Sequence, residues 1–219
     1  FDVLGSLAHI KMLQTINLLS PSELTELQQA LISLYHKIKQ GDFEIESGVE
    51  DVHSQVELIL TRELGKSGKK IHSGRSRNDQ VLLDMRLFIR AYIQNLVGDI
   101  KQLFKLLQGL SEQYKDILLP GYTHMQVAMP SSFGLWFAAY AESLTDDLLQ
   151  LQATYKIINK NPLGSAAGYG SSFPLNRTLT TQLLGFDDLN YNVVYAQMGR
   201  GRSERVVSQA LASLAETIG

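Results

Sequence analysis

The stretch that decides the fold runs from Val81 to Leu110 and reads VLLDMRLFIRAYIQNLVGDIKQLFKLLQGL. Apolar residues recur in it at steps of three and four, which is the spacing of one face of an α-helix. That face consists of Val81, Met85, Phe88, Tyr92, Leu96, Ile100, Phe104, Leu107 and Leu110. At 1.5 Å per residue the helix would be about 45 Å long, well above the usual length. Further leucines and isoleucines widen the apolar face, so we expect other helices to pack against this one on more than one side.

The segments around this helix also favour helices. A second long helix is predicted from Ser131 to about Ile158. Between the two lies the connection Leu118–Gln126, predicted to be a loop because its proline and glycine cannot continue either helix. Ser20 is predicted to cap a helix that begins at Pro21, closes a capping box with Glu23 and ends near Gly41. Shorter helices are expected over residues 49–65, 178–184 and 202–218, and loops over residues 65–74 and 161–172.

No segment shows the alternation of a β-strand, so the predicted class is mainly α, a bundle of long helices. We expect an N-terminal helical domain over residues 1–75 and the start of a central long-helix bundle over residues 76–219. The last predicted helix has an apolar side with no following segment to cover it. This indicates a bundle shared between subunits, a chain cut within its central helical domain, or both.

Composition limits the classes of function. The chain has 219 residues and a formal net charge of −2, so nothing attracts it globally to nucleic acid or to an anionic membrane. It has no cysteine, which excludes disulfides and thiolate metal sites and is compatible with a reducing cytosol. The first residues carry no targeting signal, and no uncharged stretch reaches the length of a membrane span. We therefore expect a cytoplasmic protein with no nucleic-acid or membrane partner.

The polar loop, residues 72–80, reads HSGRSRNDQ and has two arginines but only one acidic residue. A guanidinium group offers a planar fork of donors that matches a carboxylate, so this loop could hold an anion. The alternative is a solvated basic loop, which residue types alone slightly favour.

Two further places carry candidate chemistry. His124, beside Thr123 in the connection between the long helices, could transfer a proton near neutral pH, or it could simply bond to local backbone. Asp51 and His53 begin a predicted helix, where capping is the simpler explanation. No histidine pair has metal-ligand spacing, and the glycine-rich segment 164–170 lacks the lysine of a phosphate-binding loop, so no metal and no cofactor are expected.

The order of these segments resembles the argininosuccinate lyase family of the fumarase/aspartase superfamily. The resemblance is carried by the polar loop together with Pro120–Gln126, which reads PGYTHMQ. It extends over nearly the whole chain, through DVLGSLA at residues 2–8, EDVH at 50–53, GKKIH at 68–72 and PLGS at 162–165. SGRSRNDQ is specific to this branch, whereas THMQ marks only the wider superfamily.

The resemblance implies an enzyme of arginine biosynthesis that cleaves argininosuccinate to arginine and fumarate by proton abstraction and elimination. It implies that Arg77 and Asn78, helped by Ser76, hold the succinyl carboxylates, and that Thr123 bonds to the same end. His124 would take part in proton transfer and Asp51 would attract the guanidinium part of the substrate, with His53 shaping the site. Family members are homotetramers whose active sites are shared between subunits.

The chain also departs from the family pattern. The loop that carries the family's catalytic serine is missing, since GSSFPLN at residues 170–176 lacks the expected methionine and lysine and comes too early. Only Asn192 and Arg200 match the family in the region 192–200. We therefore expect the chain alone to be inactive. Two alternatives stay open: a sister lyase acting on another succinyl or aspartyl adduct, and a non-catalytic, crystallin-like relative.

Overall fold

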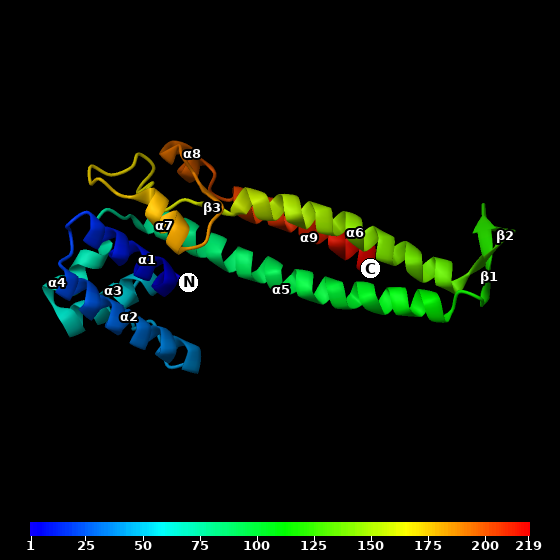
Figure 1. Cartoon of the computed structure of the whole chain (residues 1–219), viewed down its shortest axis with the longest axis horizontal. Helices are drawn as coiled ribbons and strands as arrows, with labels where there is room; N and C mark the ends of the chain where they lie inside the picture. The colour runs from blue at the N-terminus through cyan, green and yellow to red at the C-terminus, as the bar shows by residue number, and fades with distance from the viewer. The chain divides into compact units, whose positions relative to one another are not determined.

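The computed structural model describes residues 1–219 and is mainly helical (Figure 1). The chain forms two compact units, the first made of residues 1–88 and 159–200 and the second of residues 89–158 and 201–219. Each unit has a hydrophobic core of its own. These units differ from the domains 1–75 and 76–219, which stay a prediction. No helix combines the length and the apolar character needed to cross a membrane.

The first unit contains the short helices. They are α1 (Asp2–Thr15), α2 (Pro21–Gln40), α3 (Val52–Leu64), α4 (Lys66–Lys69), the 3-10 helix η1 (Lys70–His72), the first turns of α5 (Arg77–Gln113), α7 (Arg177–Leu183) and α8 (Val193–Met198). Two short strands, β3 (Lys160–Asn161) and β4 (Asp188–Leu189), pair in parallel. The main core of this unit lies among α1, α2 and α3, whose buried members include Leu13, Leu27 and Leu60.

Helix α2 confirms the predicted capping box. The Ser20 side chain accepts a hydrogen bond from the Glu23 amide at 3.2 Å, and the Glu23 carboxylate accepts one from the Ser20 amide at 2.9 Å. Gly41 ends the helix with φ +85°, a left-handed conformation that glycine adopts without strain.

Two predicted boundaries in this unit were wrong. Helix α3 begins at Val52 and not at residue 49, because the Asp51 side chain caps it by accepting from the Ser54 amide at 2.7 Å. Residues 66–72, predicted to be loop, form α4 and η1. A Cβ at Gly68 would lie 2.2 Å from the Leu60 carbonyl oxygen, so this glycine lets α4 lie against the backbone of α3. Tertiary packing of this kind overrides the loop preference of the glycines and lysines.

The second unit holds most of the first predicted long helix, α5 from residue 89 onward, and the second, α6 (Phe133–Ile158). It also contains the shorter helix α9 (Arg202–Ile218), which was predicted over the same residues. The buried core of these helices consists of Ile100, Leu144, Leu151, Ala210 and Leu214. Large apolar side chains of α6, such as Leu135 and Leu149, remain well exposed. The three helices therefore leave apolar surface without a neighbour inside this unit.

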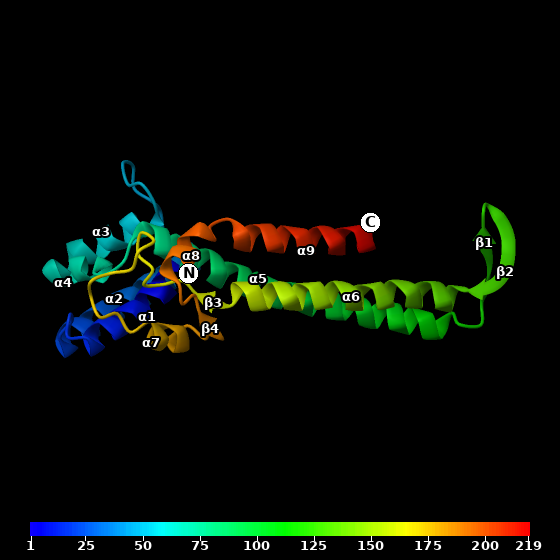
Figure 2. The same cartoon turned by 90° about the horizontal axis from the view of Figure 1, so that it is seen from above.

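The connection between α5 and α6 is a β-hairpin, so the prediction of a loop and of no strands was wrong here. Strand β1 (Leu118–Thr123) pairs antiparallel with β2 (Gln126–Ser132), and Figure 2 shows this hairpin beyond the start of α6. Pro120 faces Pro130 across the ribbon. A two-stranded ribbon has only edge strands, where the missing N–H of proline costs little. Most of its residues are exposed, which explains why the sequence lacks a strand's apolar and polar alternation.

Candidate active site

The start of α5 is held by reciprocal bonds between Ser76 and the first helical turn. The Asn78 amide donates to the Ser76 hydroxyl at 3.3 Å, and the Ser76 amide donates to an Asp79 carboxylate oxygen at 2.8 Å. The other Asp79 oxygen accepts from the amides of Gly164 and Ala166 at 3.0 and 2.9 Å. Burial raises the pKa of Asp79, although these three amide bonds oppose that rise. Asp79 thus joins the helix start to the glycine-rich segment.

Arg75 is turned inward. Its guanidinium donates to the Ser6 hydroxyl at 3.0 Å and to the Ile71 carbonyl at 2.8 Å, and the residue is only 8% exposed. Burial lowers the pKa of Arg75, while the charges of Asp2, Asp79 and Asp84 oppose that change. The idea that both arginines of the polar loop face an external anion was therefore wrong for Arg75. A solvated basic loop is equally wrong, since this side chain is part of the interior.

Arg77 keeps about a third of its side chain exposed, at 32%. Its Nη1 donates to Gln80 Oε1 at 2.9 Å and to His72 Nδ1 at 3.3 Å, and its Nη2 donates to Glu57 Oε2 at 2.9 Å. Because a guanidinium group can only donate, His72 must accept through an unprotonated Nδ1. Burial and the charge of Arg77 both lower the pKa of His72, which agrees with a neutral ring.

Asp51 lies next to Arg77 and serves as the cap of α3. One of its carboxylate oxygens is 3.8 Å from Arg77 Nε, and the side chain is about a third exposed. Burial raises the pKa of Asp51, but bonds from Ser54 and the charges of His53 and Arg77 bring it below its ordinary value. The structure thus brings Asp51, Ser76, Arg77 and Asn78 together in one unit.

A buried ionic cluster behind Arg77 was not predicted as a unit from the sequence. His53 Nδ1 lies 2.8 Å from an Asp2 oxygen and 3.8 Å from an Asp84 oxygen. Burial lowers the pKa of His53, yet the bond to Asp2 and the charges of Asp2, Asp84 and Asp51 leave it raised. Asp2 keeps a lowered pKa for the converse reason: burial raises it, but His53 and Arg75 lower it more.

Gln80 is a further polar residue beside Arg77 that was not predicted as a site residue. The sequence signal for it is its position three residues after Arg77 on the same helix, a spacing that places two side chains side by side.

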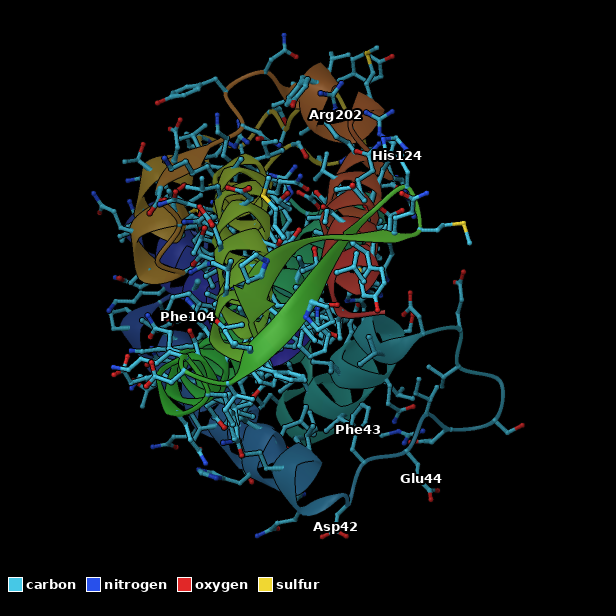
Figure 3. The ribbon with its side chains drawn as sticks, turned by 90° about the vertical axis from the view of Figure 1, so that its right-hand side faces the viewer. Asp42, Phe43, Glu44, Phe104, His124 and Arg202 are labelled. Atoms are coloured by element: carbon cyan, nitrogen blue, oxygen red, sulfur yellow. The ribbon has the colours of Figure 1, made fainter.

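Thr123 and His124 belong to the second unit. The hairpin turn holds His124 and Met125 at φ +48° and +64°, and both residues are exposed. Figure 3 shows His124 at the end of the hairpin. Two successive positive φ values are the backbone of a type I′ turn, which asparagine and glycine favour and methionine does not. Histidine adopts a positive φ more readily than methionine, so the backbone strain of this turn lies mainly at Met125.

The two segments that depart from the family pattern have local structural roles. Asn176, the last residue of the serine-bearing segment 170–176, caps α7 by accepting from the Leu179 amide at 3.0 Å. Asn192 caps α8 in the same way, through the Tyr195 amide at 2.9 Å. Arg200 donates to Asn78 Oδ1 at 2.8 Å. Arg200 is thus a further polar neighbour of the expected carboxylate-binding residues.

Comparison with known proteins decides the family. A family profile described as Lyase matches residues 2–198. The chain belongs to this lyase family. Within it, the chain is 68% identical over 217 residues to argininosuccinate lyase of Bacteroides fragilis, covering 99% of this chain and 48% of that protein. It is 38% identical to argininosuccinate lyase of Thermotoga neapolitana, covering 98% of this chain and 54% of that protein. This lyase chain therefore spans about half the length of the curated relatives it matches.

Solved structures agree with the lyase fold. A structure of EDDS lyase in complex with formate is similar with a TM-score of 0.84 at 27% identity, covering 98% of this chain and 43% of that one. A fumarate lyase, described as a delta crystallin from Brucella melitensis, is similar with a TM-score of 0.76 at 17% identity and supports the fold alone. The helical content and the solved structures confirm the mainly α class, and the Lyase profile together with the argininosuccinate lyase relatives confirms the fumarase/aspartase superfamily.

Proposed function

We propose that the protein containing this chain is an argininosuccinate lyase of arginine biosynthesis, which converts argininosuccinate to arginine and fumarate. The observation that carries this proposal is the 68% identity to a named argininosuccinate lyase over 99% of the chain, a match that includes the polar loop and the hairpin turn. The proposed partner is therefore a small, multiply charged substrate. The cytoplasm is the proposed location, and no cofactor or metal is assigned a role.

The reaction removes a proton from the succinyl carbon and breaks the bond to the guanidinium nitrogen, so that fumarate and arginine form. Negative charge develops on the succinyl part during the elimination, and fixed donors stabilise it. In the proposed site Arg77, Asn78 and Ser76 hold the succinyl carboxylates, and Thr123 bonds to the same end. His124 takes part in proton transfer, and Asp51 attracts the positive guanidinium group.

Two features of the first unit support these assignments. Arg77 is partly exposed while its buried side is anchored, so it can present part of its fork to a ligand. Asp51 lies within 3.8 Å of that fork, which places a carboxylate beside the site for a positively charged substrate group. Glu57 now bonds to Arg77 Nη2, so a substrate carboxylate would have to share or replace that contact.

A homotetramer with active sites shared between subunits is the proposed assembly. Its support is the apolar surface that α6 leaves exposed, including Leu135 at 65%, Trp136 at 47% and Leu149 at 63%. Exposed apolar surface of this extent on a long helix is typical of an interaction face.

The test is direct. The purified full-length protein is incubated with argininosuccinate, and fumarate is followed by its absorbance. Robust turnover supports the proposal, and the absence of turnover by a folded protein contradicts it.

A sister lyase acting on another aspartyl or succinyl adduct is the second candidate, favoured by the similarity to EDDS lyase. Offering EDDS and argininosuccinate in parallel separates the two, since the better substrate has the higher kcat/KM. A protein that folds and assembles but cleaves neither would favour the crystallin-like alternative.

A further inference from the structure

Gln80 is a buried residue on the first turns of α5, and the expected catalytic and substrate-binding groups do not include it. We propose that Gln80 is a positioning residue, whose side-chain amide fixes the Arg77 guanidinium by joining it to the buried Asp2–His53 pair. The inference rests on the proposed function, because it assigns the carboxylate-binding role to Arg77.

Both ends of the Gln80 amide are engaged. Its Oε1 accepts from Arg77 Nη1 at 2.9 Å, and its Nε2 donates to Asp2 Oδ1 at 3.4 Å. The residue is only 3% exposed, so water does not compete freely for either contact. The amide therefore bridges a partly exposed cation and a buried anion.

Chemistry fixes the orientation of this amide. A guanidinium group only donates and a carboxylate only accepts, so the amide oxygen must face Arg77 and the amide nitrogen must face Asp2. Neither an aliphatic side chain nor a carboxylate can make both bonds. Glutamine is the side chain of this length that fits both partners.

The far end of the bridge is firmly held. Asp2 lies on α1 and accepts from His53 Nδ1 on α3 at 2.8 Å, and both residues are buried. Asp2, His53, Arg75, Arg77 and Gln80 line one small internal pocket. Gln80 thus connects Arg77 to two packed helices rather than to a mobile surface group.

Gln80 is the closest neutral acceptor of Arg77. Glu57 and Asp51 are carboxylates, whereas the neutral His72 ring and the Ser54 hydroxyl accept at the longer distances of 3.3 and 3.4 Å. The Gln80 amide, at 2.9 Å, therefore holds Nη1 without reducing the positive charge that a substrate carboxylate would meet. A neutral anchor at this point keeps the fork oriented and still attractive to an anion.

The experiment compares two isosteric substitutions in the full-length protein. Gln80→Met removes both bonds, and we expect KM for argininosuccinate to rise about 10-fold, with a smaller change in kcat, because a hydrogen bond to a charged group is lost. Gln55→Met is the matched control. Gln55 is 2% exposed, lies in the same unit and bonds through both ends of its amide to Glu46, away from Arg77.

A double-mutant cycle separates positioning from a structural role. On an Arg77→Lys background, Gln80→Met should raise KM less than 3-fold, since the fork it positions is gone. Gln80→Glu is the second variant: it keeps an acceptor for Arg77 but partly neutralises its charge and repels Asp2, so KM should rise more than in Gln80→Met.

Equal KM values for Gln80→Met and Gln55→Met, or full additivity with Arg77→Lys, would overturn the inference. These outcomes require a wild-type protein that releases fumarate from argininosuccinate. If the folded wild type does not, the proposed function fails instead, and the two failures are thus distinguishable.

Discussion

The polar loop at residues 72–80 and the hairpin turn at Thr123–His124 differ in what surrounds them. The polar loop is tied into its unit by buried contacts, with Arg75, Asp79 and Gln80 each less than a tenth exposed. The hairpin turn is exposed at Thr123, His124 and Met125. Both segments carry family motifs. The side chains of the polar loop are already fixed by contacts within their unit, whereas those of the hairpin turn are not. Substitutions in the loop should therefore affect stability and function together, and those in the turn function alone.

The largest effect is expected from His124→Asn in the full-length protein. General acid or base catalysis contributes on the order of 10²–10⁴-fold, so kcat should fall about 10³-fold. Because the imidazole is exposed, the free energy of unfolding should change by less than about 0.5 kcal/mol. Steady-state kinetics and urea unfolding measure the two quantities. A large loss of stability would mean that the turn is not an isolated element.

Arg77→Lys is expected to lower kcat/KM about 100-fold. A lysine supplies a point charge and cannot replace the fork that bonds to Gln80, His72 and Glu57. The exposed Arg62→Lys, whose guanidinium pairs with Glu46, is the control and should keep wild-type kinetics. Near-normal activity of Arg77→Lys would refute its assignment to the substrate carboxylate.

Asp79→Asn should destabilise the first unit by about 2 kcal/mol. Asp79 accepts three backbone N–H bonds, and an asparagine would turn one N–H₂ group toward those donors. Asp99→Asn, on the same helix, removes an exposed carboxylate and should be nearly neutral. Equal unfolding midpoints in urea for the two variants would show that the helix start needs no such anchor.

Asp84→Asn tests how the buried Asp2–His53–Asp84 cluster makes the free energy of unfolding depend on pH. Burial, together with the charge of Asp2, raises the pKa of Asp84 from its ordinary value of 3.8 to about 7. Between about pH 4 and 7 the carboxyl of Asp84 has lost its proton in the unfolded chain but retains it in the folded protein. The contribution of Asp84 to the free energy of unfolding therefore falls as pH rises. The variant lacks this contribution, so its free energy of unfolding relative to that of the wild type should be higher at pH 8 than at pH 4. Urea unfolding at both pH values measures the difference, and a parallel response of the two proteins would contradict the prediction.

The smallest effect is expected from Met125→Gly in the hairpin turn. Met125→Gly relieves a positive φ of +64° but adds freedom to the unfolded chain, so stability should rise by no more than about 0.5 kcal/mol. A thermal shift assay is sufficient, with Met129→Gly in the adjoining strand as the destabilising control. A clear loss of stability in Met125→Gly would indicate that the methionine side chain supports the hairpin.

Much of the fold was predictable because local physics agreed with the tertiary outcome. The apolar spacing of residues 81–110 predicted the core of α5, and the capping box at Ser20 fixed the start of α2. The hairpin escaped prediction because its strands are edges exposed on both faces, so no buried face imposes alternation. Helix α4 escaped because a glycine in contact with α3 outweighs local preference.

The candidate site, like the fold, has features that the sequence predicted and features that only the tertiary structure showed. Residue types and motif order by themselves determined the mainly α class, the family resemblance and the choice of Arg77, Asn78 and His124 as candidates. Only the tertiary structure decided that Arg75 is buried, that Asp79 ties the helix start to Gly164, and that Gln80 joins Arg77 to Asp2. A sequence states which donors and acceptors exist, but burial and pairing decide which of them remain free for a ligand, and these depend on segments that are distant along the chain.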